Sequence, residues 1–311
     1  MKTLRTISEL RAAIAPHRLD GKRIGLVPTM GYLHAGHASL IERAASECDL
    51  VITTVFVNPL QFAATEDLAS YPRDEQGDAD TASAAGADLF FLPSLDEMYP
   101  LGRDGVLTSV SVSDLSSVME GASRPTHFAG MCTVVAKLFN IAGPCTAYFG
   151  KKDFQQLAIV KAMVRDLSFE VDVIGCGIRR EADGLAMSSR NVYLTPEQRT
   201  AAPVLFAALC AAAQALSGGE TSAEILRATM TDVINTQTLG QVEYLEIVDP
   251  ITLGAVAQAD LHSRFFGAVR FGSVRLIDNL DLTELDLTGL DLTGLDLTGL
   301  DPDASQPSAG A

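Results

Sequence analysis

The sequence predicts an α/β protein in which a doubly wound parallel sheet is followed by a smaller α+β domain. Short apolar runs of strand character alternate with helical patterns in the first part of the chain, which is typical of a parallel sheet covered on both faces. After residue 184 the order changes to two helical patterns followed by strand-like runs. We therefore expect a Rossmann-like domain at 1–178, a smaller domain at 179–280 and a tail at 281–311.

Each element of the first domain follows from apolar patterning and its breakers. Strands are expected at 23–28, 50–57, 88–92, 145–149 and 171–175, and helices around 37–47, 74–86, 129–142 and 153–166. Pro28 and Gly31 end the first strand, and Gly150 ends the fourth. In the second domain, helices are expected at about 196–217 and 221–237, and strands at 242–248 and 267–277.

The segment His34-Ala-Gly-His37 lies between the first strand and the first helix of this pattern. Helix N-termini carry unpaired N–H groups and a partial positive charge, which attract phosphate. Gly36 has no side chain that would hold a ligand away from these backbone groups. Imidazoles three residues apart can share one helical face and donate to the same phosphate oxygens. Alone, such a pair is more often structural than functional, so its interpretation depends on the segments that follow.

Two later segments favour a nucleotide phosphate site. Lys152 follows Gly150 at a second strand-to-helix crossing, which places a cation at its tip. Ser188, Ser189 and Arg190 offer hydroxyl and guanidinium donors that suit a polyphosphate. Taken singly, these segments also fit a solvated lysine turn and a serine helix cap. Their order along one α/β chain favours ligand binding at the carboxyl ends of the strands.

With these motifs the chain resembles the pantothenate synthetase (pantoate–β-alanine ligase) family of the nucleotidylyltransferase superfamily, which shares an H-x-G-H motif. The resemblance rests on six segments and ends near 275–279; the segments are 27–37, 56–62, 71–73, 120–130, the Lys152 turn and 183–191. It implies ATP-dependent condensation of pantoate with β-alanine to pantothenate through a pantoyl adenylate, with release of AMP and pyrophosphate. It also implies a homodimer and the same division into domains.

The resemblance also implies roles for individual residues. Those expected at the triphosphate are Met30 (through its backbone), His34, His37, Lys152, Ser188, Ser189 and Arg190. Those expected at the ribose and adenine are Gly150, Asp153 and Met187. Those expected at pantoate are Gln61, Gln156, Phe56, Phe149 and Asn58. Without the motifs, the phenylalanines would be read as core and the glutamines as surface amides.

Metal binding is expected to accompany the nucleotide. Mg²⁺ keeps most of its ligands as water and phosphate, so it should arrive with ATP and need no dedicated protein site. Asp78 and Glu120 are the carboxylates that we expect to contact metal-bound water or to support the site from behind.

Composition constrains the partners and the compartment. The net charge is −16, and the absence of a basic domain disfavours a nucleic-acid ligand. The five cysteines form no C-x-x-C pair and read as reduced thiols of a cytoplasmic protein. The N-terminus lacks an apolar signal region, and the apolar stretch 201–216 is short and interrupted by Pro203 and Gln214, so we expect no membrane span.

The tail repeats the pattern D-L-T-x-L four times with a period of five. It resembles a pentapeptide-repeat β-helix, but four units are too few to bury a core of their own, so disorder or packing on the main body is expected. Residues 281–311 carry seven acidic and no basic side chains, and the resemblance to the family ends before them.

Two alternatives remain open from the sequence. One is another adenylyltransferase that uses a nucleotide or a different acid, although two glutamines with two phenylalanines favour a small branched hydroxy acid. The other is a binding or scaffold protein whose acidic tail contacts a partner; retention of every phosphate motif argues against it.

Overall fold

The computed structural model describes residues 1–63, 66 and 68–284. The contacts of the chain divide it into two compact units. The first comprises Met1–Arg180 with Met187–Ser189, and the second comprises Glu181–Ala186 with the described residues from Arg190 onward. Residues Met187–Ser189, the start of the Ser188-Ser189-Arg190 segment (the serine motif), thus belong to the first unit. The apolar pattern did not predict this.

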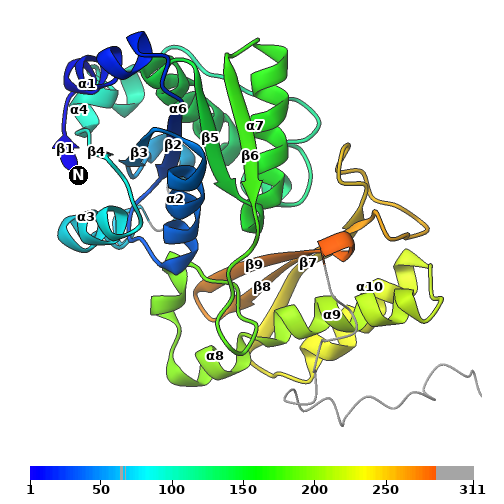
Figure 1. The fold of residues 1–311 in the computed structure, drawn as a ribbon. Coiled ribbons are helices and arrows are strands. Elements are labelled where there is room, and N and C mark those ends of the chain that lie inside the picture. The colour runs from blue at the N-terminus through cyan, green and yellow to red at the C-terminus, as the bar shows by residue number, and fades with distance from the viewer. Residues whose placement is uncertain (64–65, 67, 285–311) are drawn as a thin grey trace, which may run out of the picture. The chain divides into compact units, whose positions relative to one another are not determined.

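The first unit is built on a six-stranded sheet in which every pair of neighbours is parallel, with the order β1-β4-β3-β2-β5-β6 (Figure 1). Its strands are β1 (Lys2–Leu4), β2 (Ile24–Thr29), β3 (Leu50–Val55), β4 (Leu89–Phe91), β5 (Cys145–Gly150) and β6 (Val171–Cys176). The predicted fold class is confirmed. All five expected strands form; β1 was not expected.

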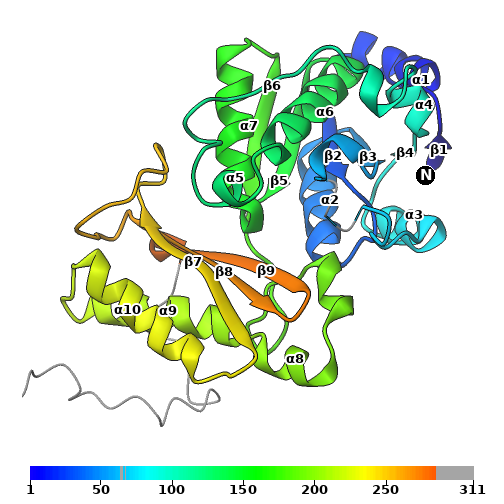
Figure 2. The ribbon, with the colours of Figure 1, turned by 180° about the vertical axis from the view of Figure 1, so that it is seen from behind.

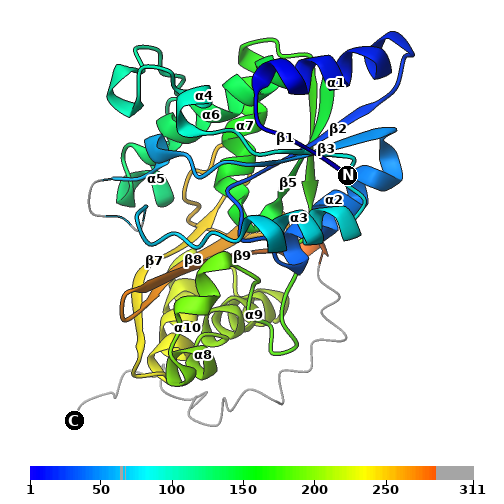
Figure 3. The same cartoon turned by 90° about the vertical axis from the view of Figure 1, so that its left-hand side faces the viewer.

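Helices cover both faces of this sheet, as Figure 3 shows with α1 on one side and α2 and α3 on the other. One face packs on α1 (Ile7–Leu19), α6 (His127–Ala142) and α7 (Phe154–Asp166). The other packs on α2 (Ala35–Glu47) and α3 (Glu75–Ala84). Because strand side chains alternate between faces, Leu26 and Ile52 join the first core and Val27 and Val51 join the second. Short helices α4 (Leu95–Met98) and α5 (Glu120–Ser123) complete the unit.

The strand order reverses between β2 and β5. β2 pairs with β3 over six residues, and β5 pairs with β6 over six, but β2 and β5 pair only at Gly25–Thr146 and Leu26–Ala147. The carboxyl-terminal halves of β2 and β5 are therefore not joined to each other. Open α/β sheets bind ligands at such a reversal, in the crevice beyond the carboxyl ends of the strands.

The second unit contains a three-stranded antiparallel sheet of order β7-β8-β9, with α9 and α10 lying on one face (Figure 2). Its elements are α8 (Pro196–Ala201), α9 (Val204–Ser217), α10 (Ala223–Asn235), β7 (Gly240–Val248), β8 (Arg264–Phe271) and β9 (Val274–Asp281). This is the expected α+β arrangement.

Two predicted elements of this unit are corrected by the structure. The helix expected at 196–217 is divided into α8 and α9 at Ala202 and Pro203, because proline has no N–H to continue the helical ladder. The strand expected at 267–277 is a hairpin of β8 and β9 that turns at Gly272, whose φ of +60° suits glycine.

The stretch Pro196–Ser217 is long and apolar enough to cross a membrane by length and composition alone. However, 67% of its most apolar window is buried, and α9 supplies nine buried residues to the core of the second unit. That is the pattern of a core helix.

The described chain continues into the first residues that the sequence assigned to the tail. Asp281 ends β9 opposite Arg264, and Leu282, only 5% exposed, lies in the core of the second unit. Asp281 and Leu282 therefore belong to the folded unit. The expectation of a repeat at 285–311 lies outside the described residues.

Candidate active site

The loop between β2 and α2 is held in a strained conformation by one carboxylate. Gly31 and Tyr32 both have positive φ, +91° and +53°. Asp78 on α3 accepts the backbone N–H of Tyr32 at 3.0 Å and that of Leu33 at 2.6 Å. A Cβ at Gly31 would lie 2.8 Å from an Asp78 oxygen, so glycine is required there. The loop thus delivers His34 to the start of α2 in one fixed position.

The two histidines of the motif cap α2 with their own rings. His34 is the N-cap, and its Nδ1 accepts the N–H of Gly36 at 3.1 Å; His37 Nδ1 accepts the N–H of His34 at 3.3 Å. An imidazole that accepts at Nδ1 carries its proton on Nε2. Both residues therefore present Nε2–H donors, with ring centroids 4.1 Å apart.

These imidazoles are neutral at physiological pH. The pKa of His34 is lowered to about 4 by burial and by the positive charge of Lys152. The pKa of His37 is lowered to about 3 by burial, by His34 and by Lys152. Their contribution to an anion is therefore hydrogen-bond donation, with the full positive charge supplied by Lys152.

Gly36 leaves room for the His34 ring that caps α2. A Cβ there would lie 2.8 Å from Cε1 and 2.9 Å from Nδ1 of His34. The sequence interpretation gave Gly36 the role of leaving space for the ligand. The structure shows that a side chain would first displace the His34 ring from its cap.

Lys152 reaches the histidines from the neighbouring strand. It follows β5 in the 3₁₀ turn Lys151–Asp153, which runs directly into α7. Its side chain is 18% exposed and lies 3.7 Å from Asp153, its ion-pair partner. The strand-to-helix crossings after β2 and β5 thus meet at the reversal of strand order, and they bring His34, His37 and Lys152 together.

The segment Met187–Ser189 lies against the loop that carries the histidines. Ser189, 8% exposed, donates its hydroxyl to the carbonyl of Tyr32 at 3.1 Å. A Cβ on Gly36 would lie 3.7 Å from the Cβ of Met187. Met187 and Ser189 therefore lie beside the loop that carries the histidines. Arg190 begins the returning segment of the second unit.

The residues expected at pantoate come from the ends of β3 and β5. Phe56 follows β3, and Phe149 lies within β5; both are core residues of the first unit. Gln61 lies in the 3₁₀ turn Pro59–Gln61 and is 6% exposed. Gln156 is half-buried in the first turn of α7.

Asn58 lies behind the site. It is fully buried, and its amide contacts Gln61, Leu60, Gly130 and Tyr99. The family resemblance predicts direct contact with pantoate. In the structure both ends of its side chain contact protein atoms, and contact with pantoate stays a prediction.

Sequence reasoning missed two buried polar residues that organise the site. Gln155, beside Gln156, donates to the carbonyls of Leu115 and Val118 and accepts the N–H of Glu120. Tyr99, at the end of α4, donates to Asn58 at 2.8 Å. No local motif marks them, because their partners are 35 to 41 residues away in the chain.

The carboxylates considered for metal-bound water, Asp78 and Glu120, are both buried. Both oxygens of Asp78 accept backbone N–H groups, and burial raises the pKa of this carboxyl. Glu120 is 8% exposed. Within residues 1–63, 66 and 68–284, no three His, Cys, Asp or Glu side chains gather closely enough to hold a metal ion.

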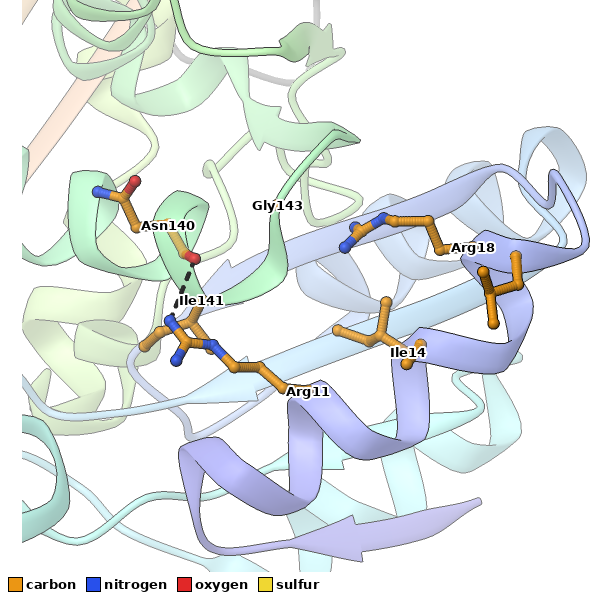
Figure 4. Close-up of a pocket in the computed structure, with 8 residues that line it drawn as sticks. Arg11, Ile14, Arg18, Asn140, Ile141 and Gly143 are labelled. Atoms are coloured by element: carbon orange, nitrogen blue, oxygen red, sulfur yellow. Dashed lines mark hydrogen bonds between the residues drawn. The ribbon is translucent and has the colours of Figure 1, made fainter.

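A cavity of about 460 Å³ between α1 and the end of α6 is separate from this site (Figure 4). Arg18 and Arg11 line it and donate to the carbonyls of Ala142 at 2.6 Å and Asn140 at 3.5 Å. Those carbonyls end α6, so the guanidinium groups cap a helix C-terminus. The cavity contains none of the predicted site residues, and we assign it no part in the function.

Paired imidazole donors and a lysine at the reversal of a doubly wound sheet define a nucleotide-binding α/β protein. The family model for pantoate–β-alanine ligase matches residues 2–281. The chain therefore belongs to the pantoate–β-alanine ligase family, and it is an enzyme of that family.

Curated relatives and solved structures agree with this assignment. The pantothenate synthetase of Chloroflexus aggregans is 50% identical over 90% of this chain and 99% of its own length. The structure of pantothenate synthetase from Thermus thermophilus has a TM-score of 0.86 and 46% identity, over 91% of this chain and 99% of that one. The Francisella tularensis pantoate–β-alanine ligase, complexed with β-γ ATP and β-alanine, has a TM-score of 0.73 and 32% identity, over 91% of this chain and 98% of that one.

Proposed function

We propose that this enzyme condenses pantoate with β-alanine in two steps driven by ATP. In the first, a carboxylate oxygen of pantoate attacks the α-phosphorus, the bond to the bridging oxygen breaks, and pyrophosphate leaves. In the second, the amine of β-alanine attacks the acyl carbon of the pantoyl adenylate, AMP leaves, and the amine loses a proton to solvent. The products are pantothenate, AMP and pyrophosphate.

One observation carries this proposal: His34 and His37 present two neutral Nε2–H donors beside the ammonium of Lys152. Negative charge on the phosphates grows as pyrophosphate departs, and preorganised donors stabilise such charge without having to reorganise. No covalent nucleophile is needed, since positioning the carboxylate and stabilising the leaving group suffice.

The remaining residues take the roles expected from the family. The backbone of Met30 and the side chains of Ser188, Ser189 and Arg190 complete the triphosphate site. Gly150 and Asp153 contact the ribose, and Met187 contacts the adenine. Gln61 and Gln156 bind the hydroxyl and carboxylate groups of pantoate, with Phe56 and Phe149 against its methyl groups.

Mg²⁺ enters as part of the substrate, as MgATP. Support comes from the preference of Mg²⁺ for water and phosphate ligands. We further propose that the enzyme is a cytoplasmic homodimer and that 1–178 and 179–280 act as catalytic and covering domains.

Isotope exchange tests the order of the two steps. Pantoate alone should support exchange of labelled pyrophosphate into ATP, because the adenylate forms before the amine is needed. β-Alanine should not be required, and other acids or nucleotides should not replace pantoate. Exchange that appears only with β-alanine, or AMP formed from ATP and β-alanine without pantoate, would overturn the mechanism.

A further inference from the structure

We propose that Tyr99 is a positioning residue for pantoate: acting through Asn58, it fixes the side-chain amide of Gln61 with its oxygen toward the protein and its nitrogen toward the substrate. The inference rests on the proposed function, since it assigns the polarity of the pantoate site. Tyr99 reaches the site from α4, outside every motif of the sequence.

The orientation of the Asn58 amide is fixed by two backbone groups. Its Nδ2 donates to the carbonyl of Gly130 at 3.0 Å, and its Oδ1 accepts the N–H of Leu60 at 3.3 Å. A carbonyl can only accept and an N–H can only donate, so a flipped amide would face two repulsive contacts. Tyr99 stabilises the orientation that these backbone groups select, because its hydroxyl donates to Oδ1 at 2.8 Å.

The orientation of Gln61 follows from that of Asn58. Asn58 Nδ2 also donates to Gln61 Oε1 at 2.9 Å, so the oxygen of the Gln61 amide faces inward. Among the described residues, none accepts a hydrogen bond from Gln61 Nε2. The nitrogen therefore offers its two N–H donors to a ligand, although the residue as a whole is only 6% exposed.

The backbone of Gln61 is held independently of Tyr99. Its carbonyl contacts Nδ1 of His127 at 3.0 Å and accepts from Arg124 at 3.3 Å. On the other side, a Cβ on Gly130 would lie 2.7 Å from the Gln61 nitrogen, so α6 packs directly against this turn. Removal of the Tyr99 hydroxyl should therefore disturb the side-chain amides and leave the backbone in place.

Tyr99 also contacts the apolar half of the same site. Its ring packs edge-on against Phe56 with centroids 5.8 Å apart, and it is 3% exposed. Burial raises the pKa of its hydroxyl, which keeps the proton available for Asn58. Tyr99 thus contacts the Phe56 ring directly and acts on the Gln61 amide through Asn58.

The consequence is a rule of specificity. A fixed N–H₂ group selects a hydrogen-bond acceptor, such as a carboxylate or hydroxyl oxygen, and rejects an ammonium or amide N–H at the same place. The site should therefore accept hydroxy acids and discriminate against acids that carry a donor-only group where pantoate has its acceptor.

The test is Tyr99→Phe, with Tyr148→Phe as the matched control. Tyr148 is equally buried, but its hydroxyl bonds Glu47 and Cys48, which are not predicted site residues. Pantoate-dependent pyrophosphate exchange gives KM values for pantoate and ATP. We expect Tyr99→Phe to raise KM for pantoate about tenfold, with KM for ATP and the thermal midpoint nearly unchanged. Tyr148→Phe should leave both KM values unchanged.

Two further variants separate positioning from general structure. Asn58→Asp keeps the size of the side chain but replaces the donor to Gln61, so KM for pantoate should rise about a hundredfold. In a Gln61→Ala background, Tyr99→Phe should have little further effect, since the two act on one contact. Equal rises in both KM values, or additive effects, would overturn the inference.

The outcomes also distinguish this inference from the proposed function. If the unaltered enzyme fails to catalyse pantoate-dependent exchange, the proposed function is wrong. If it catalyses exchange and Tyr99→Phe matches it in KM for pantoate, only the positioning role of Tyr99 is wrong.

Discussion

The carboxylate of Asp78 lies 2.6 Å from the backbone nitrogen of Leu33, across 45 residues of sequence. Together with its contact to Tyr32, this bond stabilises a loop with two successive positive φ values. Strain of this kind persists only where surrounding groups hold it. The position of His34, the next residue along the chain, therefore depends on a carboxylate from a different helix.

Asp78→Asn should slow adenylate formation. One oxygen becomes an N–H₂ group that faces a backbone N–H, so the loop loses one acceptor and gains a repulsive contact. We expect pantoate-dependent pyrophosphate exchange to fall by about 10- to 100-fold. Asp80→Asn, on the same helix but exposed, is the control and should exchange at the normal rate. A normal rate for Asp78→Asn would show that the loop holds its shape without this contact.

Lys152→Ala should damage the first half-reaction far more than the second. Loss of a preorganised charge costs on the order of 10²–10³ in rate, or about 3–4 kcal/mol. Supplying preformed pantoyl adenylate should bypass most of the defect, because the phosphates have by then departed. Lys161→Ala, which removes an exposed lysine on α7, is the control and should leave both half-reactions at their normal rates. An equal loss with the preformed intermediate would assign Lys152 to folding or amine capture.

Stability should decline in mild acid because of buried histidines. Burial lowers the pKa of His34, His37 and His127 from 6.5 to about 4, 3 and 4 in the folded protein. Above pH 6.5 they are neutral in both states; as pH falls from 6.5 toward 4, the unfolded chain takes up protons that the folded protein cannot. Each such histidine lowers the free energy of unfolding by up to about 1.4 kcal/mol for each pH unit in this range.

Thermal midpoints between pH 7 and 5 measure this effect. His127→Gln can still donate to the carbonyl of Gln61, so its midpoint should fall less steeply with pH than that of the unaltered protein. His262→Gln, at an exposed histidine, should retain the original slope. Identical slopes for all three proteins would contradict the assignment of this loss to His127.

Leu282→Ala should destabilise the second unit without affecting catalysis. Leu282 is buried in that core, and removing a buried leucine side chain costs about 2–5 kcal/mol. Ile251→Ala, at a site 81% exposed, should change stability by less than about 0.5 kcal/mol. Unfolding by urea measures the difference. Equal stability of the two variants would place Leu282 outside the core.

The fold of the first unit was largely predictable because its central strands, such as β3 and β4, are apolar and buried on both faces. β1 and α1 were not predicted, since β1 has three residues and α1 buries only Leu10 and Ile14 and contains Pro16. The hairpin of β8 and β9 was read as one strand because apolar residues continue on both sides of Gly272. The two-residue turn Gly272-Ser273 reverses the chain there with apolar residues on both sides.

The site was predictable only where chemistry follows local sequence. His34, His37 and Lys152 each stand at a strand-to-helix crossing, so the order of elements brings them together. The donor polarity of Gln61 could not be predicted, because it depends on which way Asn58 faces. That orientation is selected by Leu60 and Gly130 and stabilised by Tyr99, and two of these three come from remote segments.

The short pairing of β2 with β5 has a mechanical consequence. Six paired residues join the strands on either side of this seam, but only two pairs bridge it. Fewer ladder hydrogen bonds oppose separation here than elsewhere in the middle of the sheet. In hydrogen–deuterium exchange of the ligand-free enzyme, amides near the ends of β2 and β5 should exchange faster than those of β3. Nucleotide bound across the seam should slow them, because it would join the four-stranded part of the sheet, β1-β4-β3-β2, to the two-stranded part, β5-β6.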